Sequence, residues 1–222
     1  MNQSVWTAVD QYFAEVLLPE DAALESALNF SQSAGLPPHQ VAPNQGKFLQ
    51  LLAQIQGANR ILEIGTLGGY STIWLARAVP ADGCVITLEA NPQYARVAAD
   101  NIANAGLAEI VEIRVGKALD TLNQLVRSQI TPFDLIFIDA DKPSNPDYLK
   151  VSLKLSRPGT IIIGDNVVRG GEVSNVDSSD PKVQGVQQFC RLMAQEPRLS
   201  ATAIQTVGSK GYDGFVIARV TH

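Results

Sequence analysis

Residues 60–72 read RILEIGTLGGYST, a short apolar run that ends in glycines and leads into a segment of helical character. Glycines after a strand let the backbone turn tightly and approach a ligand closely. Taken alone, they are equally typical of an ordinary turn between a strand and a helix. The alternation of apolar runs and amphipathic segments in the following hundred residues therefore carries the prediction of the fold.

Four further apolar runs follow, and amphipathic segments separate them. Strands that alternate with helices predict right-handed βαβ units and a parallel sheet. The nearly continuous apolar character of the runs predicts strands that are covered on both faces. The expected strands occupy 60–65, 84–90, 110–116, 133–141 and 160–166, and the expected helices occupy 71–79, 92–106, 118–129 and 146–156.

The two ends of the chain differ from this pattern. Residues 1–57 predict three helices, at 6–18, 21–35 and 44–57, where glycines and acids mark the ends. The first helix should present an apolar face made of Trp6, Val9, Phe13, Val16 and Leu17.

After a loop at 167–180, we expect a helix at 181–195 and then two antiparallel strands within 199–220, joined by a seven-residue turn. We therefore expect one domain over 1–222, with N-terminal helices at 1–57 and a core at 58–222.

Composition excludes several classes of protein. The chain has 222 residues, 45% of them hydrophobic and 18% charged, which suits a sizeable core. A net charge of −5 argues against a broad nucleic-acid surface. The two cysteines, Cys84 and Cys190, form no disulfide framework or zinc spacing, and they favour a reducing compartment. Without a signal peptide or a long apolar run, we expect a cytoplasmic protein with neither nucleic-acid nor membrane partners.

Polar side chains stand at the carboxyl ends of the expected strands, where open α/β sheets bind ligands. Glu89 ends the second strand, and there it could accept hydrogen bonds from both hydroxyls of a ribose. The glycines at 65–69 lack the dinucleotide spacing Gly-x-Gly-x-x-Gly. Glu63 interrupts an apolar strand, so it either forms an internal ion pair or faces the amino-acid end of a ligand. These features predict a nucleoside-binding site.

Asp139 ends the fourth expected strand and Asp165 and Asn166 end the fifth, and all three offer oxygen ligands without histidine or cysteine. Such ligands suit a hard cation, most simply Mg²⁺, with Ca²⁺ or Mn²⁺ as alternatives. An Asx turn would also explain the Asp-Asn pair. The only histidines, His39 and His222, lie in a loop and at the last position, which argues against a histidine-based triad.

The order of these motifs resembles the class I S-adenosylmethionine-dependent methyltransferases, and within them the cation-dependent O-methyltransferases that include catechol and caffeoyl-CoA O-methyltransferases. The markers are LEIGTLGGYST, TLEANP, GKA, DLIFIDADK, RPGTIIIGDN and YDG, spread between Val41 and Val220. The resemblance implies an α/β, Rossmann-like fold: a mostly parallel seven-stranded sheet flanked by helices, with an antiparallel C-terminal strand and an N-terminal helical extension. It also implies a homodimer.

The resemblance assigns roles to individual residues. Those expected to bind S-adenosylmethionine are Val41, Glu63, Gly65, Ser71, Glu89, Ala118 and Asp139. Asp139, Asp165 and Asn166 would hold the divalent cation, and Lys142 would act as the general base. Arg169 and Tyr212 would contact the substrate, although many relatives carry tryptophan near position 169. An arginine there admits an anionic group on the substrate.

We therefore expect an enzyme that methylates one hydroxyl of a vicinal diphenol, such as a catechol, a hydroxycinnamoyl ester or a flavonoid. Chelation by a cation helps such a diphenol to lose a proton. Two alternatives remain open. An NAD-dependent oxidoreductase would share the acid after the second strand but would need the missing glycine spacing. A protein that binds a nucleoside cofactor without catalysis would need none of Asp139, Lys142, Asp165 and Asn166.

Overall fold

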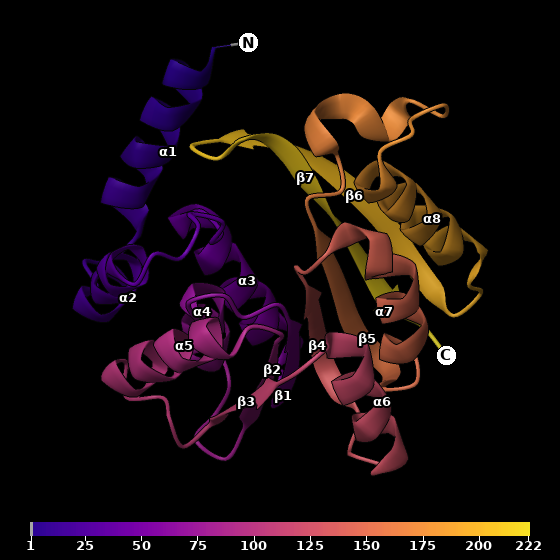
Figure 1. Cartoon of the computed structure of the whole chain (residues 1–222), viewed down its shortest axis with the longest axis horizontal. Coiled ribbons are helices and arrows are strands. Elements are labelled where there is room, and N and C mark those ends of the chain that lie inside the picture. The colour runs from indigo at the N-terminus through magenta and orange to yellow at the C-terminus, as the bar shows by residue number, and fades with distance from the viewer. Residues whose placement is uncertain (1) are drawn as a thin grey trace.

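The computed structural model describes residues 2–222, which form one continuous sheet between two layers of helices (Figure 1). The strands are β1 (Arg60–Ile64), β2 (Cys84–Glu89), β3 (Val111–Val115), β4 (Phe133–Ile138), β5 (Ser156–Asp165), β6 (Leu199–Gly208) and β7 (Gly211–Val220). The α-helices are α1 (Gln3–Leu17), α2 (Ala22–Ser33), α3 (Pro43–Gln56), α4 (Tyr70–Ala76), α5 (Pro92–Asn104), α6 (Ala118–Arg127), α7 (Asn145–Ser152) and α8 (Pro181–Gln195). Two 3₁₀ segments are η1 (Lys142–Ser144) and η2 (Arg169–Ser174).

The sheet has seven strands in the order β3-β2-β1-β4-β5-β7-β6. Strands β1 to β5 run parallel, and β7 pairs antiparallel with both β5 and β6. The expected mostly parallel sheet with an antiparallel C-terminal strand is therefore confirmed. All six residues of the central strand β4 are buried, as its apolar sequence predicted.

Each face of the sheet has its own apolar core. Helices α6, α7 and α8 cover one face, where Leu122, Leu149 and Phe189 are almost completely buried. Helices α2 to α5 cover the other face, where Leu49 and Ile73 are equally buried. Figure 1 shows these layers as the orange-pink and the purple helices on either side of the sheet. Burial on both faces fixes the central strands β1, β2 and β4, so their polar carboxyl ends are held at one edge of the sheet.

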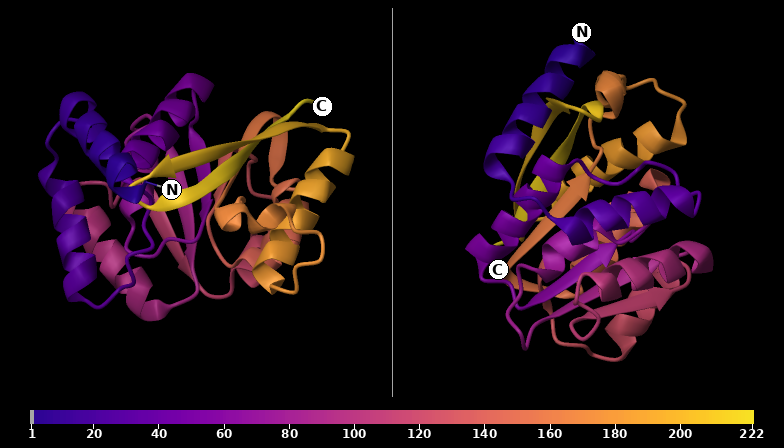
Figure 2. Two further views of the ribbon diagram at one scale, coloured as in Figure 1. Left: turned by 90° about the horizontal axis from the view of Figure 1, so that it is seen from above. Right: turned by 90° about the vertical axis from the view of Figure 1, so that its left-hand side faces the viewer.

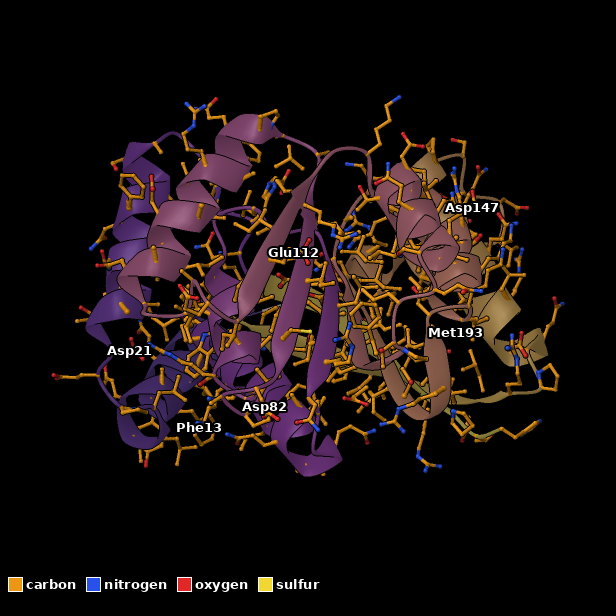
Figure 3. All side chains as sticks on the ribbon, turned by 90° about the horizontal axis from the view of Figure 1, so that it is seen from below. Phe13, Asp21, Asp82, Glu112, Asp147 and Met193 are labelled. Atoms are coloured by element: carbon orange, nitrogen blue, oxygen red, sulfur yellow. The ribbon has the colours of Figure 1, made fainter. Side chains whose placement is uncertain are left out.

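Helix α1 forms as predicted, but its apolar face does not join either core. No residue of α1 is buried, and Phe13, Val16 and Leu17 are 46%, 61% and 67% exposed. Phe13 lies on the outside of the molecule (Figure 3). Periodicity predicts which side chains share a face of a helix, but it does not identify what covers that face.

The C-terminal strands are longer than the sequence indicates. The expected seven-residue turn is wrong: only Ser209 and Lys210 lie between β6 and β7, and Gly208 pairs with Gly211. The polar and glycine residues of this segment are typical of a turn. They nevertheless continue the β6–β7 ladder, because this edge of the sheet faces solvent. The resulting hairpin reaches α1 (Figure 2), where the Ser209 amide donates to Asp10 Oδ2 at 2.7 Å.

The loop expected at 167–180 also contains structure, namely η2. Its first residue, Arg169, has a φ of +56°, which side chains other than glycine rarely adopt. The amides of Val168 and Arg169 both donate to Asp213 Oδ1, at 2.9 and 3.1 Å. Asp213 of the YDG motif therefore holds this loop in its strained conformation.

Strands β1 and β4 meet at Gly65. A Cβ atom on Gly65 would lie 2.1 Å from the carbonyl oxygen of Asp139, and the φ of Gly65 is +106°. Only glycine satisfies both conditions. This close approach brings the end of β1 against the end of β4. The glycine loop after β1 and the acidic turn after β4 are therefore neighbours in space.

Glu63 lies beneath this contact and is fully buried in β1. Its carboxylate accepts hydrogen bonds from the hydroxyls of Ser71 and Thr87, each at 2.6 Å, and from the hydroxyl of Thr72. No ion pair involves Glu63 among the described residues, so the alternative of an internal salt bridge is wrong. Burial raises the pKa of Glu63 to about 7, although the three hydroxyls act in the opposite direction.

The raised pKa of Glu63 predicts a pH-dependent stability. The folded state binds a proton here more tightly than the unfolded state, so the contribution to stability is complete below pH 4.5 and is lost as pH rises through 7. We expect Glu63→Gln to gain about 3 kcal/mol relative to the wild type between pH 4.5 and 8. Urea unfolding of both proteins across this range measures the difference, and a pH-independent difference would contradict the assignment.

Candidate active site

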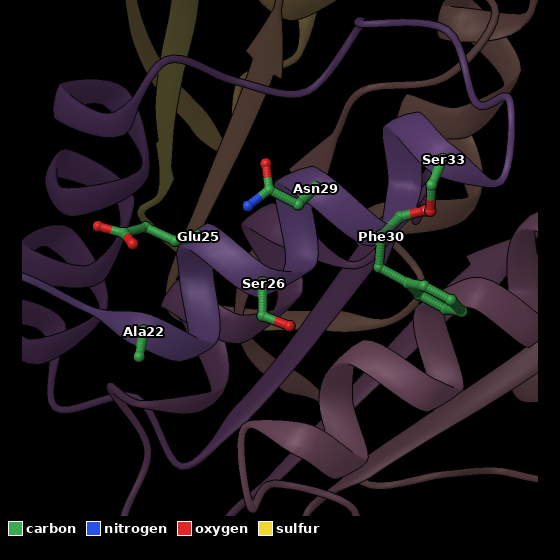
Figure 4. A pocket seen from close by; sticks show the side chains of 6 residues that line it. All are labelled: Ala22, Glu25, Ser26, Asn29, Phe30 and Ser33. Atoms are coloured by element: carbon green, nitrogen blue, oxygen red, sulfur yellow. The ribbon is translucent and has the colours of Figure 1, made fainter.

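The carboxyl ends of the parallel strands open into a cavity of about 1470 Å³. This volume exceeds the 300–1,000 Å³ typical of a pocket for one small ligand, so the cavity has room for two ligands. The segments that follow all five parallel strands line it, together with residues 36–41 and the β6–β7 turn. A separate shallow hollow, shown in Figure 4, is lined by side chains of α2 alone, including Glu25 and Asn29.

Glu89 anchors the glycine loop at one end of the cavity. Its Oε2 accepts the amide of Leu67 at 2.8 Å, and its Oε1 accepts the amide of Asn91 at 2.8 Å. Each carboxylate oxygen keeps a further lone pair for a ligand hydroxyl. Glu89 also lines the cavity, in agreement with the position predicted for a ribose acceptor.

Asn101 on α5 is a supporting residue that the sequence did not reveal. The side chain is 2% exposed, and its amide donates to the carbonyl of Gly68 at 2.9 Å and to the hydroxyl of Ser31 at 3.2 Å. It therefore fixes the glycine loop from below. A lone asparagine in a helix carries no sequence signal for this contact, because the partner lies 33 residues earlier.

The other residues expected at the cofactor fall into two groups. Val41, Gly65, Ser71 and Ala118 line the cavity together with Glu89 and Asp139. Glu63 does not line it, because it lies behind Ser71 and accepts that residue's hydroxyl. A direct contact between Glu63 and a ligand is thus not supported by this geometry, and Glu63 acts by orienting Ser71.

The acidic end of the cavity brings Asp139, Asp165 and Asn166 together with Lys142. Lys142 Nζ donates to Asp139 Oδ1 at 2.9 Å, and the lysine is 6% exposed. Burial, and secondly the negative charge of Asp139, raise the pKa of Asp165. The Asp139 and Asp165 carboxylates therefore lie close enough to repel one another, and the Lys142 ammonium pairs with Asp139.

Gln45 on α3 is a second supporting residue that the sequence did not reveal. Its amide donates to Asp165 Oδ2 at 2.7 Å, while the Asn166 amide donates to Asp165 Oδ1 at 2.8 Å. Both oxygens of Asp165 are thereby oriented. Within residues 2–222, no three side chains of the His, Cys, Asp or Glu type gather in a way that could hold a metal ion. The predicted ligand set contains only two carboxylates, with an amide as its third member.

The turn that carries Lys142 is tied to α7 through Asp141. The Asp141 carboxylate accepts the hydroxyls of Ser144 and Tyr148. Lys142 lies between these anchored residues, and the main chain of α8 packs against it: a Cβ atom on Gly185 would lie 2.3 Å from the Lys142 carbonyl oxygen. The lysine therefore projects from a turn that is anchored on both sides.

The two residues expected at the substrate separate in the structure. Arg169 lines the cavity, and its Nη1 lies 3.8 Å from Asp213 Oδ2. Tyr212 does not line the cavity: its hydroxyl donates to Gln205 on the neighbouring strand, and its ring packs against the core. The prediction for Tyr212 is therefore not supported, because β7 directs its side chain away from the strand ends. Asp213, the next residue, does not line the cavity either, but it contacts Arg169, which does.

Known proteins resemble the chain along nearly its whole length. The family model described as O-methyltransferase matches residues 15–220. A catechol O-methyltransferase of Niastella koreensis is 51% identical over 99% of this chain and 100% of its own length.

Two solved structures agree with this result. An O-methyltransferase from Bacillus cereus in complex with SAH is 60% identical, with a TM-score of 0.98 over 99% of this chain and 100% of that one. The O-methyltransferase TomG from Streptomyces achromogenes, in complex with SAM, is 50% identical, with a TM-score of 0.97 over all of both chains. The chain belongs to the O-methyltransferase family, and the expectation of a class I, S-adenosylmethionine-dependent O-methyltransferase is confirmed.

Proposed function

We propose that this enzyme methylates one hydroxyl of a vicinal diphenol and that a divalent cation assists it. The observation that carries the proposal is the meeting of Asp139, Lys142, Asp165 and Asn166 at one end of a cavity whose other end holds Glu89. The printed name of the Niastella koreensis relative, a catechol O-methyltransferase, supports the same class of acceptor. An oxidoreductase or a non-catalytic binding protein has no comparable support.

The cofactor would occupy the half of the cavity formed by the glycine loop. Glu89 would accept the ribose hydroxyls, Ser71 and Gly65 would contact the methionine part, and Ala118 would leave room for the adenine. S-adenosylmethionine carries a methyl group on a sulfonium, which an oxygen anion attacks in line. The chain's contribution is to align the acceptor oxygen with that methyl group.

Asp139, Asp165 and Asn166 would hold the cation. The donor set fits a hard cation such as Mg²⁺, because all three side chains offer oxygen. Burial, and secondly the negative charge of Asp139, raise the pKa of Asp165, and a bound cation would offset that charge. A bound cation stabilises the phenolate of a chelated diphenol. Gln45 would keep Asp165 in position for this role.

Removal of the cation tests this proposal. We expect EDTA to abolish transfer of a labelled methyl group to catechol and added Mg²⁺ to restore it. Binding of S-adenosylmethionine should persist in EDTA, because Glu89, the proposed ribose acceptor, follows β2, and β1 separates that strand from β4 and the acidic residues. Full activity in EDTA, with elemental analysis showing no metal, would contradict the three-ligand site.

Lys142 would take the proton from the hydroxyl that is methylated. Its ammonium pairs with Asp139, one of the proposed ligands, so a bound cation would compete for that carboxylate and disfavour the ammonium form. The neutral amine would then lie beside the chelated hydroxyl, where a general base is required.

Lys142→Met removes the amine and keeps most of the side chain's volume. We expect kcat to fall about 10²–10⁴-fold, with unchanged affinity for S-adenosylmethionine and partial recovery at high pH, where hydroxide replaces the base. Steady-state rates between pH 6.5 and 9.5 measure this effect. Near-normal turnover at neutral pH would mean that the cation alone activates the hydroxyl.

We also propose that the enzyme is a homodimer in a reducing, cytoplasmic setting. The exposed apolar face of α1 supports a partner surface, because Val9, Phe13, Val16 and Leu17 would otherwise remain in water. Both cysteines are free, which fits a reducing compartment. None of the helices in the described residues is both long enough and apolar enough to cross a membrane.

Disruption of α1 tests the dimer. We expect the double variant Phe13→Ser and Leu17→Ser to halve the mass measured by light scattering after gel filtration, since both side chains would leave the interface. Val176→Ser serves as control, because Val176 is 75% exposed in a loop outside α1. A wild-type mass equal to the 23.8 kDa chain would contradict the proposal.

A further inference from the structure

Glu63 is a fully buried acid to which the proposed methyl transfer assigns no step. Ser71 connects it to the cavity, because the Ser71 side chain lines the cavity and its hydroxyl lies 2.6 Å from Glu63 Oε1. A change in the charge of Glu63 therefore reaches a bound ligand through one hydroxyl group.

The two oxygens of Glu63 have unequal surroundings. Oε2 meets two hydroxyls, those of Thr72 and Thr87, whereas Oε1 meets only that of Ser71 among the described residues. A neutral carboxyl group carries its proton on one oxygen and still accepts hydrogen bonds on the other. The proton of a neutral Glu63 thus belongs on Oε1, where it points at the Ser71 oxygen.

The groups around Glu63 favour this neutral form near pH 7. The neighbouring strands present Thr87 from β2 and Phe137 from β4 in register with Glu63, and neither is charged at that pH. Asp139, which follows β4, is the charged group that acts on Glu63. Burial raises the pKa of Glu63 to about 7, the negative charge of Asp139 acts in the same direction, and the hydroxyls oppose both.

Protonation of Glu63 reverses the hydrogen bond with Ser71. An ionised Glu63 takes the only proton of the Ser71 hydroxyl, so Ser71 presents lone pairs to the cavity. A neutral Glu63 donates to Ser71 instead, and the Ser71 proton is then free to point into the cavity. In this second state Ser71 is a hydrogen-bond donor, which fits an anionic group of the ligand.

The cofactor has one anionic group, the carboxylate of its amino-acid end. We propose that Glu63, as a neutral acid, is the positioning residue for this carboxylate: Glu63 donates to Ser71, and Ser71 donates to the carboxylate. An ionised Glu63 opposes binding, since it turns a lone pair of Ser71 and a buried negative charge toward the same group. The inference rests on the place that the proposed function gives to the methionine part, and it adds a dependence on protons.

The pH dependence of binding tests this relay in the wild type. Calorimetric titration of S-adenosylhomocysteine, the product of methyl transfer, is carried out in EDTA between pH 6 and pH 8. We expect about tenfold weaker binding at pH 8 than at pH 6, because the neutral fraction of Glu63 falls by about that factor. 5′-Methylthioadenosine keeps the adenosine and the sulfur but lacks the amino-acid end, so its affinity should stay constant over this range.

Glu63→Gln assigns the effect to this residue. The glutamine amide has the shape of the neutral acid: its nitrogen donates to Ser71 permanently, and its oxygen accepts the hydroxyls of Thr72 and Thr87. We expect this variant to bind S-adenosylhomocysteine at pH 8 as tightly as the wild type does at pH 6. The ratio of the two affinities at each pH is the measured quantity, since titration of the ligand and of Asp165 is common to both proteins and cancels.

Two further variants serve as controls. Glu109→Gln makes the same substitution at an exposed acid that does not line the cavity, and it should keep the pH dependence of the wild type. Ser71→Ala removes the hydroxyl that carries the relay. It should weaken binding of S-adenosylhomocysteine about tenfold at pH 6 and leave 5′-methylthioadenosine unaffected.

Several results would overturn the inference. They are a ratio of wild-type to Glu63→Gln affinities that stays constant with pH, and an equal pH dependence for the two ligands in the wild type. Equal affinities of the two ligands would also overturn it, because the amino-acid end would then contribute nothing. The titrations contain neither acceptor nor cation, so an enzyme that fails to methylate catechol would contradict the diphenol proposal and not this one. If Glu63→Gln does not fold, the comparison of the two ligands in the wild type decides.

Discussion

The contact between Gly65 and the Asp139 carbonyl is the constraint on which the site depends. A side chain at position 65 would collide with that carbonyl at 2.1 Å, so β1 and β4 can end side by side only with glycine there. The strand order changes direction between β1 and β4: β2 and β3 lie on one side of β1, and β4 and β5 lie on the other. Such a switch point leaves a crevice at the carboxyl ends, where ligands bind.

This arrangement gives the two halves of the cavity different chemistry. On the β1–β3 side, backbone amides and the carboxylates of Glu63 and Glu89 organise the loop that would hold the cofactor. On the β4–β5 side, the acids have an ammonium and an amide as their partners, Lys142 and Gln45. Arg169, Lys182 and Lys210 line the cavity beyond these acids. The reacting atoms of the proposed methyl transfer would meet where the halves join.

The sequence predicted those parts that short-range pattern determines. Apolar runs gave the parallel strands, and their polar ends identified Glu89, Asp139 and Asp165 at one edge. Long-range contacts were not predictable: Gln45 and Asn101 reach their partners across 120 and 33 residues, and neither lies in a motif. The exposed face of α1 was missed because periodicity is the same for a covered and an uncovered helix. Tyr212 and Asp213 point to opposite faces of β7, so Asp213 contacts Arg169 while the Tyr212 hydroxyl donates to Gln205.

We infer that Glu89 and the glycine loop form a cofactor site that is complete without metal or acceptor. Calorimetric titration of S-adenosylmethionine into the wild type and Glu89→Ala, both in EDTA, tests it most directly. We expect one site per chain in the wild type and at least about tenfold weaker binding in the variant, because a charge-assisted hydrogen bond contributes about 1.5–3 kcal/mol. Equal affinities, or no binding without metal, would contradict it.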